Sequence, residues 1–109
     1  MENKRVIQLK QFLADTPNDA FLNYALAIEY VGMGNDGEAK TIFETLYNTQ
    51  PDYTATYYHL GKLYERENRK EEAEAIYRKG ITATMKKREQ HAMAELQNAL
   101  ANLWIDDED

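Results

Sequence analysis

The chain contains no cysteine, only two prolines and five glycines, and a single tryptophan among its 109 residues. The lack of cysteine excludes a disulfide framework, a thiol nucleophile and a cysteine-based zinc site. No apolar run approaches the roughly 18 residues that identify a membrane helix, and the charged start, Met1 to Arg5, is not followed by the apolar core of a signal peptide. These absences predict a cytoplasmic protein without membrane insertion.

Positive charge is also scarce. Lys and Arg number 13 against 19 Asp and Glu, which gives a net charge of -6. An acidic chain repels nucleic acid unless a local basic patch offsets the repulsion. The one basic run, Lys86-Lys87-Arg88, is short, and we expect it to be the solvated start of the last helix. The composition therefore predicts no nucleic-acid partner, and an apolar content of 43% predicts one globular domain.

What the chain does contain is a repeat. Identical residues recur at a fixed spacing of 34 positions: Pro17 and Pro51, Tyr24 and Tyr58, Leu26 and Leu60, Tyr30 and Tyr64, Glu38 and Glu72, Ala39 and Ala73, and Ile42 and Ile76. A period of this length is typical of repeat architectures, in which each unit buries its apolar face against its neighbours. Chains of this kind usually bind other proteins and carry out no chemistry.

Turn residues divide each unit into two helices. Both prolines stand at the same phase, each followed by a residue that can cap a new helix, Asn18 or Asp52. Gly34 and Asn68 share a second phase, and both residue types tolerate the left-handed conformation that closes a helix. Alternation of period two is absent. The pattern predicts an all-α protein with helices near residues 3–15, 18–33, 36–49, 52–67, 70–82 and 85–104.

The second unit resembles the tetratricopeptide repeat family, because it places Tyr57, Leu60-Gly61, Tyr64, Ala73 and Tyr77 at the family's positions. The first unit matches less fully: Asn23 stands where a large residue is expected and Leu46 where a small one is usual. After Gly80 the pattern fails. The resemblance implies a small bacterial-type member with a right-handed helix-turn-helix solenoid. We expect one domain, 1–109, with a capping helix at 1–16, repeats at 17–50 and 51–84, a second capping helix at 85–105 and an acidic tail at 106–109.

The resemblance also implies a concave groove formed by the first helix of each unit, which would dock a peptide or helix of a partner protein. The predicted groove residues are Phe21, Tyr24, Ile28, Tyr58, His59, Lys62, Arg66 and Met93. Tyr24 and Tyr58 occupy equivalent positions. They are either aromatic anchors for the partner or rings that pack on a neighbouring helix and expose only a hydroxyl.

Candidates for chemistry are weak. The family's carboxylate clamp needs Lys and Asn where this chain has Tyr24 and Ile28, so we predict no such clamp. His91 and Glu95 are spaced i,i+4, but two ligands are too few for zinc. His59 lacks a partner nucleophile. We therefore predict a non-catalytic protein that needs no metal or cofactor.

Self-association is the alternative function. Met85, Ala92 and Ala99, together with Leu96 and Leu103, fit a short heptad pattern that would make a homodimer through the last helix. The residues proposed for this contact are Met93, Leu96, Leu100 and Trp104. Trp104 has a second interpretation, in which it completes the core of the second unit.

Overall fold

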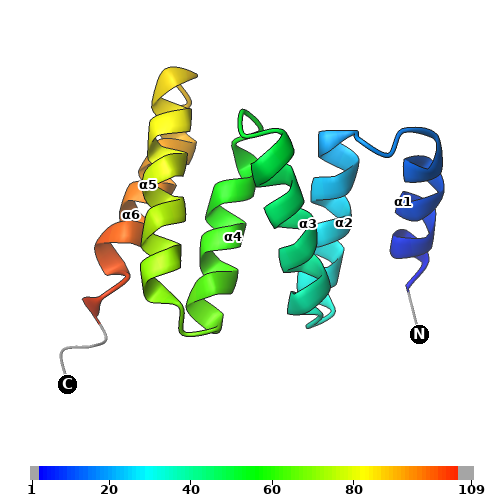
Figure 1. Cartoon of the computed structure of the whole chain (residues 1–109), viewed down its shortest axis with the longest axis horizontal. Helices are drawn as coiled ribbons and strands as arrows, with labels where there is room; N and C mark the ends of the chain where they lie inside the picture. Colours follow the sequence, from blue (N-terminus) through cyan, green and yellow to red (C-terminus); the bar gives the residue numbers. More distant parts are fainter. Residues whose placement is uncertain (1–2, 106–109) are drawn as a thin grey trace. The chain divides into compact units, whose positions relative to one another are not determined.

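The computed structural model describes residues 3–105, and these residues form six α-helices and no strand (Figure 1). The predicted all-α fold is therefore confirmed. The acidic tail predicted at 106–109 lies outside the described residues. The helices are α1 (Lys4–Asp15), α2 (Ala20–Gly32), α3 (Asp36–Thr49), α4 (Ala55–Arg66), α5 (Lys70–Lys86) and α6 (Gln90–Asn102).

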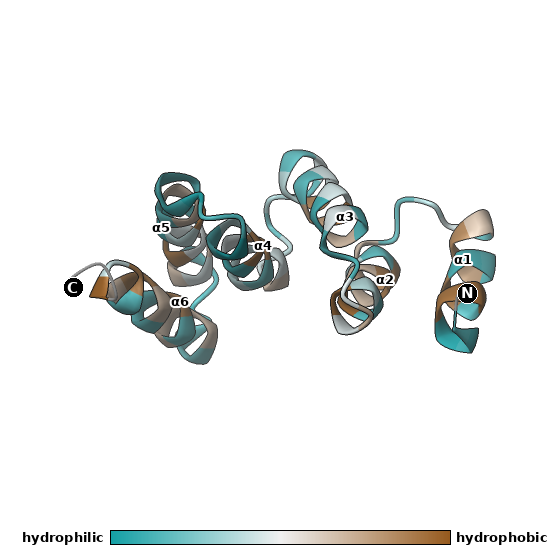
Figure 2. Cartoon of the chain, turned by 90° about the horizontal axis from the view of Figure 1, so that it is seen from below, coloured by the Kyte–Doolittle hydropathy of each residue, from teal (hydrophilic) through white to brown (hydrophobic). Residues whose placement is uncertain are grey.

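The helices form two compact units. The first ends at Tyr53 and contains α1, α2 and α3; the second begins at Thr54 and contains α4, α5 and α6. In the first unit α2 packs against both α1 and α3, and in the second unit α5 packs against α4 and α6. In Figure 2 the hydrophilic residues follow the outer side of α5, as expected for a helix that buries one stripe.

Capping explains where α2 begins. The side chain of Asp19 accepts a hydrogen bond from the backbone N–H of Leu22 at 2.8 Å, so α2 begins at Ala20 and not at residue 18 as predicted. The residues after Pro17 form a turn instead, in which the N–H of Asp19 donates to the carbonyl of Thr16. α4 likewise begins later than the predicted residue 52, after a turn closed by the N–H of Tyr53 and the carbonyl of Gln50.

The two predicted left-handed positions are confirmed. Gly34 has a φ of 76° and Asn68 a φ of 61°. Each is followed by a residue whose N–H closes the preceding helix: Asn35 donates to the carbonyl of Tyr30 at 2.8 Å and Arg69 to that of Tyr64 at 2.9 Å. Both turns are helix C-terminal caps of the type in which one residue adopts the left-handed conformation.

The prediction for the last two helices was wrong. α5 extends to Lys86, and a third turn of the same type follows, with Arg88 at a φ of 59° and the N–H of Glu89 donating to the carbonyl of Thr84 at 2.9 Å. Lys86 is thus the end of α5 and not the start of α6. Met85 also belongs to α5, so the predicted heptad through α6 loses its first member. The boundary was missed because an arginine occupies the left-handed position, where glycine or asparagine is the usual signal.

Size complementarity builds the core of the second unit. A Cβ added to Gly61 of α4 would collide with the ring of Tyr77 of α5, and one added to Gly80 would lie 2.6 Å from the Cβ of Tyr57. Leu96 of α6 contacts the same glycine, at 2.9 Å from that added Cβ. The small residue at position 61 therefore lets α4 and α5 approach closely.

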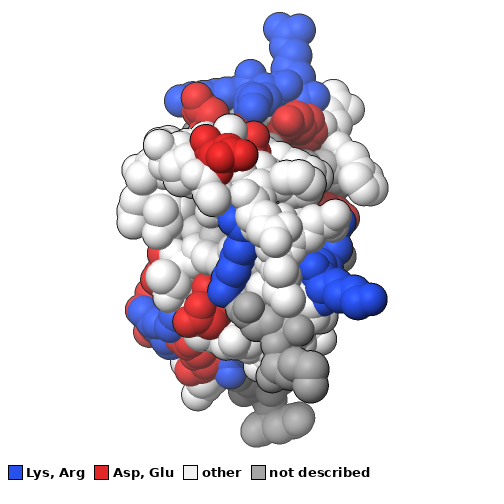
Figure 3. Space-filling model, turned by 90° about the vertical axis from the view of Figure 1, so that its right-hand side faces the viewer, with Lys and Arg blue, Asp and Glu red and all other residues white. Residues whose placement is uncertain are grey.

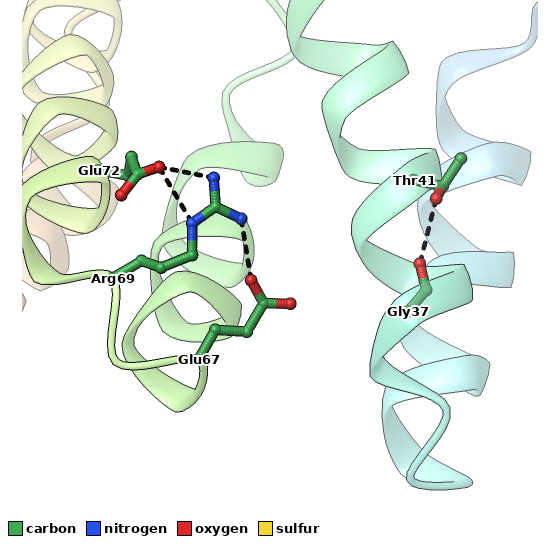
Figure 4. Close-up of polar contacts among 5 residues, drawn as sticks. All are labelled: Gly37, Thr41, Glu67, Arg69 and Glu72. Carbon is green, nitrogen blue, oxygen red and sulfur yellow. Dashed lines mark hydrogen bonds and ion pairs between the residues drawn. The ribbon is translucent and has the colours of Figure 1, made fainter.

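An arginine fork fixes the turn between α4 and α5 (Figure 4). The guanidinium of Arg69 donates to Glu72 at 2.5 and 3.0 Å and to Glu67 at 2.9 Å, and it lies over the ring of Tyr64, 4.8 Å from the centroid. The hydrogen bond from Arg69 lowers the pKa of the Glu72 carboxyl. Figure 4 also shows Thr41 of α3, whose hydroxyl donates to the carbonyl of Gly37 at 3.1 Å.

Candidate functional site

Apart from Met93 on α6, the residues predicted to contact a partner lie on α2 in the first unit and on α4 in the second unit. In the first unit the predicted residues Phe21, Tyr24 and Ile28 lie on one face of α2, because helical neighbours are spaced by three or four residues. Phe21 is 59% exposed, whereas Tyr24 and Ile28 are half-buried. Phe21 is therefore the large apolar side chain that α2 offers to a partner.

Tyr24 packs within its own unit. Its ring centroid lies 6.1 Å from that of Phe43 and 5.8 Å from that of Tyr53, with interplanar angles near 60°. Burial raises the pKa of the Tyr53 hydroxyl, and the neighbouring Tyr24 and Asp19 raise it further. These contacts agree with the interpretation of Tyr24 as a packed ring.

Tyr58, at the equivalent position of the second unit, is surrounded differently. The ring of His59 meets the Tyr58 ring edge-on, with centroids 5.5 Å apart and an interplanar angle of 90°. The ammonium of Lys62 lies 5.5 Å from the Tyr58 ring centroid, within the range of a cation–π contact. The structure thus brings together three predicted residues, Tyr58, His59 and Lys62, which we call the α4 cluster.

Two carboxylates influence the α4 cluster, Glu65 through an ion pair and Glu95 through its charge. Glu65 lies 3.6 Å from the ammonium of Lys62 and also accepts a hydrogen bond from the hydroxyl of the buried Tyr77. Burial lowers the pKa of His59, and Glu95 of α6 opposes that shift. His59 is therefore held mainly as a neutral imidazole at pH 7, next to a carboxylate contributed by a neighbouring helix.

Sequence reasoning missed the role of α6 in this surface. The N-cap residue of α6, Glu89, accepts a hydrogen bond from the hydroxyl of Thr54 at 2.5 Å, which ties the start of α6 to the start of α4. The sequence indicates Glu95 only as a candidate metal ligand with His91, whose Nε2 lies 3.7 Å from the Glu95 carboxylate. Residues 3–105 contain no cluster of three or more His, Cys, Asp or Glu side chains that could hold a metal.

Other predicted site residues lie elsewhere. Arg66 is exposed at the end of α4. Met93 lines a hollow at the α5–α6 turn, and no residue of the α4 cluster lines that hollow. The face seen in Figure 3 carries both signs of charge, with Lys and Arg gathered along its upper edge.

The residues proposed for self-association are partly internal. Leu96 is only 2% exposed, and Met93 and Leu100 are half-buried. Trp104 folds back on its own unit, because its indole N–H donates to Glu74 of α5 at 3.0 Å and the ammonium of Lys70 lies 5.5 Å from its ring. These contacts agree with the interpretation in which Trp104 completes the second unit.

Within the described range, no helix is both long and apolar enough to cross a membrane. The sequence model of the tetratricopeptide repeat family matches residues 54–84. No match was found among curated proteins.

Several solved structures resemble this chain over most of its length. The chain is 44% identical to a tetratricopeptide repeat domain protein from Salinibacter ruber. In the crystal structure the match covers 78% of this chain and 96% of that one with a TM-score of 0.76. In a solution NMR structure of such a domain from the same organism the match covers 80% and 88%, also with 44% identity and a TM-score of 0.76. A protein from Bordetella parapertussis, 21% identical, has the same fold over 98% of this chain and 92% of its own, with a TM-score of 0.81.

Proposed function

This chain belongs to the tetratricopeptide repeat family, and on that premise we propose that it is a non-catalytic module that binds a peptide or helix of a partner protein. The α4 cluster is the observation that carries the proposal. Aromatic rings with polar tips are common anchors of protein interfaces, and an ordered cluster loses less entropy on binding than mobile side chains do.

The α4 cluster offers a partner three kinds of contact. Tyr58 supplies a ring and a hydroxyl, His59 a neutral imidazole, and Lys62 a cation. The ammonium of Lys62 lies between the Tyr58 ring and the carboxylate of Glu65, which restricts its position. A peptide with an apolar residue beside a polar or acidic one suits this combination.

The first unit contributes an apolar contact. Phe21 is the most exposed of its predicted groove residues, and Ile28 is half-buried on the same helix. We assign Tyr24 a supporting role, because its ring already packs on Phe43 and Tyr53. We propose no carboxylate clamp, since Tyr24 and Ile28 carry no charge at positions where the clamp needs Lys and Asn.

The proposal gives His59 a role in recognition and none in catalysis. Burial lowers its pKa, its ring meets that of Tyr58, and the charge of Glu95 acts on it. A general base acts on a nucleophile or a substrate proton within hydrogen-bond reach. The α4 cluster combines a ring, an imidazole and a cation, and this combination suits side-chain contacts with a partner.

The test is a crosslinked capture from native lysate with wild type and the Phe21→Ala/Tyr58→Ala variant. Phe12→Ala is the matched control, because Phe12 is 53% exposed and lies on α1. We expect one partner to be lost from the double variant and retained by the control, with equal helicity by circular dichroism. Equal capture by all three proteins would contradict the proposed surface.

A further inference from the structure

The second half of α5 and the turn after it form a basic surface in an acidic protein. Between residues 75 and 88 the sequence has five cations and no carboxylate, although the chain as a whole carries a net charge of -6. All five are exposed, and they are Arg78, Lys79, Lys86, Lys87 and Arg88. Arg78 is paired with Glu74 at 3.0 Å, and Lys86, Lys87 and Arg88 follow one another at the α5–α6 turn.

A hollow lies at this turn, with a volume of about 130 Å3. Met85 is 59% exposed beside it and Met93 is half-buried within it. Methionine adapts its shape to an incoming apolar side chain. The lining contains one carboxylate, Glu89, which is engaged by the hydroxyl of Thr54 at 2.5 Å. The surface therefore suits an apolar residue next to several carboxylates.

We propose that the basic surface and its methionine hollow bind the C-terminal segment of a second copy of this chain, with Ile105 in the hollow. Ile105 is 54% exposed, and Figure 2 shows that the described chain ends in hydrophobic residues. The sequence continues with Asp106, Asp107, Glu108 and Asp109, which supply four negative charges directly after the apolar residue. The order of the segment, one apolar residue and then four acids, matches the order of hollow and cations.

The segment of the same copy cannot occupy this hollow. The α5–α6 turn and residue 105 lie at opposite ends of α6 (Figure 1), and the 13 residues of α6 span about 20 Å. Ile105 is the last described residue and lies at the far end of that helix, so only another molecule can bring it to the turn. Because the two contacting surfaces differ, the contact either repeats from copy to copy or closes as a dimer in which each copy binds the segment of the other.

This contact uses different residues from the α4 cluster. The proposed self-association and the proposed binding of a partner protein can therefore fail independently. Sedimentation equilibrium of the full chain at about 20 mM and about 500 mM NaCl measures the association and its salt dependence. We expect the mass to rise with protein concentration at low salt and to return toward the monomer at high salt. Lys86→Glu/Lys87→Glu and Ile105→Ser should each weaken association at least about tenfold, a change that sedimentation readily resolves.

Complementation tests whether the segment of one copy binds the basic surface of another. Lys86→Glu/Lys87→Glu retains an intact C-terminal segment, and Asp106→Lys/Asp107→Lys retains an intact basic surface. Each variant alone should stay monomeric, and their mixture should form a dimer that does not extend. Lys4→Glu/Lys10→Glu, with the same change in net charge on α1, is the control and should associate as wild type does.

Several outcomes would overturn the proposal. A wild type that stays monomeric at low salt would do so, as would association that survives Lys86→Glu/Lys87→Glu. A mixture that stays monomeric would also contradict it. Binding of monomeric wild type to vesicles rich in phosphatidylserine, lost in Lys86→Glu/Lys87→Glu, would assign the basic surface to a membrane instead.

Discussion

The ring of Tyr77 on α5 occupies the place where a side chain at Gly61 on α4 would lie. A Cβ built on Gly61 falls 2.6 Å from Cζ of Tyr77, closer than real Cβ contacts come. Both residues are buried, and the ring belongs to a side chain that is fully enclosed. The approach of the two helices therefore depends on the absence of a single methyl group.

Gly61→Ala is expected to destabilise the protein by about 2 kcal/mol or more, because an enclosed ring cannot move aside cheaply. Urea denaturation followed by circular dichroism measures this difference. Gly37→Ala is the matched control: Gly37 is also helical, and an added Cβ there meets nothing within 4 Å. The control should be neutral or slightly stabilising, since alanine favours helices. Equal losses in the two variants would contradict the close packing of Gly61 on Tyr77.

The Tyr77 hydroxyl predicts a dependence of stability on alkaline pH. Its pKa is raised well above the ordinary value of 10.0, first by burial and then by the hydrogen bond to Glu65. Above pH 10 the unfolded chain releases this proton while the folded protein keeps it. The stabilisation that this hydroxyl contributes should thus be fully present below pH 10. As the pH rises beyond 10, the free energy of unfolding should fall by up to roughly 1.4 kcal/mol per pH unit for one proton.

Tyr77→Phe removes this titration and leaves the ring. We expect the variant to lose about 1 kcal/mol at pH 7, because the carboxylate of Glu65 loses a donor. Its unfolding free energy should then fall less steeply than that of wild type between about pH 10 and 11. The same measurements on Tyr47→Phe, at a half-buried tyrosine of α3, provide the comparison. Parallel pH profiles for wild type and Tyr77→Phe would disprove the assignment.

Asp19 should contribute more to stability than its exposed position suggests. It is the N-cap of α2, and its side chain accepts a hydrogen bond from the N–H of Leu22. Asp19→Ala is expected to lower the free energy of unfolding by about 1 kcal/mol. The control is Asn35→Ala at the N-cap of α3, where no side-chain cap bond forms. Thermal unfolding of both variants tests the difference, and similar melting temperatures would argue against the cap.

The α4 cluster and the basic surface show where prediction from the sequence ended. Tyr58, His59 and Lys62 could be placed on one face from helical spacing alone. Their link to α6 could not, because Glu89 and Glu95 lie at least 27 residues further along the chain (from Lys62 to Glu89) and carry no motif. The turn at Arg88 was missed for a related reason, since the residue in the left-handed position is not one that favours it.

The sequence by itself determined the repeat, the all-α fold, the family and most helix boundaries. These follow from a 34-residue period, from the two prolines and from the turn residues at Gly34 and Asn68, all of which act locally along the chain. Only the tertiary structure decided that Tyr24 packs on Phe43 while the equivalent Tyr58 meets His59 and Lys62. It also decided that Leu96 is internal and that Met93 lines a separate hollow. Equivalent residues differ in this way because the side chains around them come from other helices, which a local pattern does not specify.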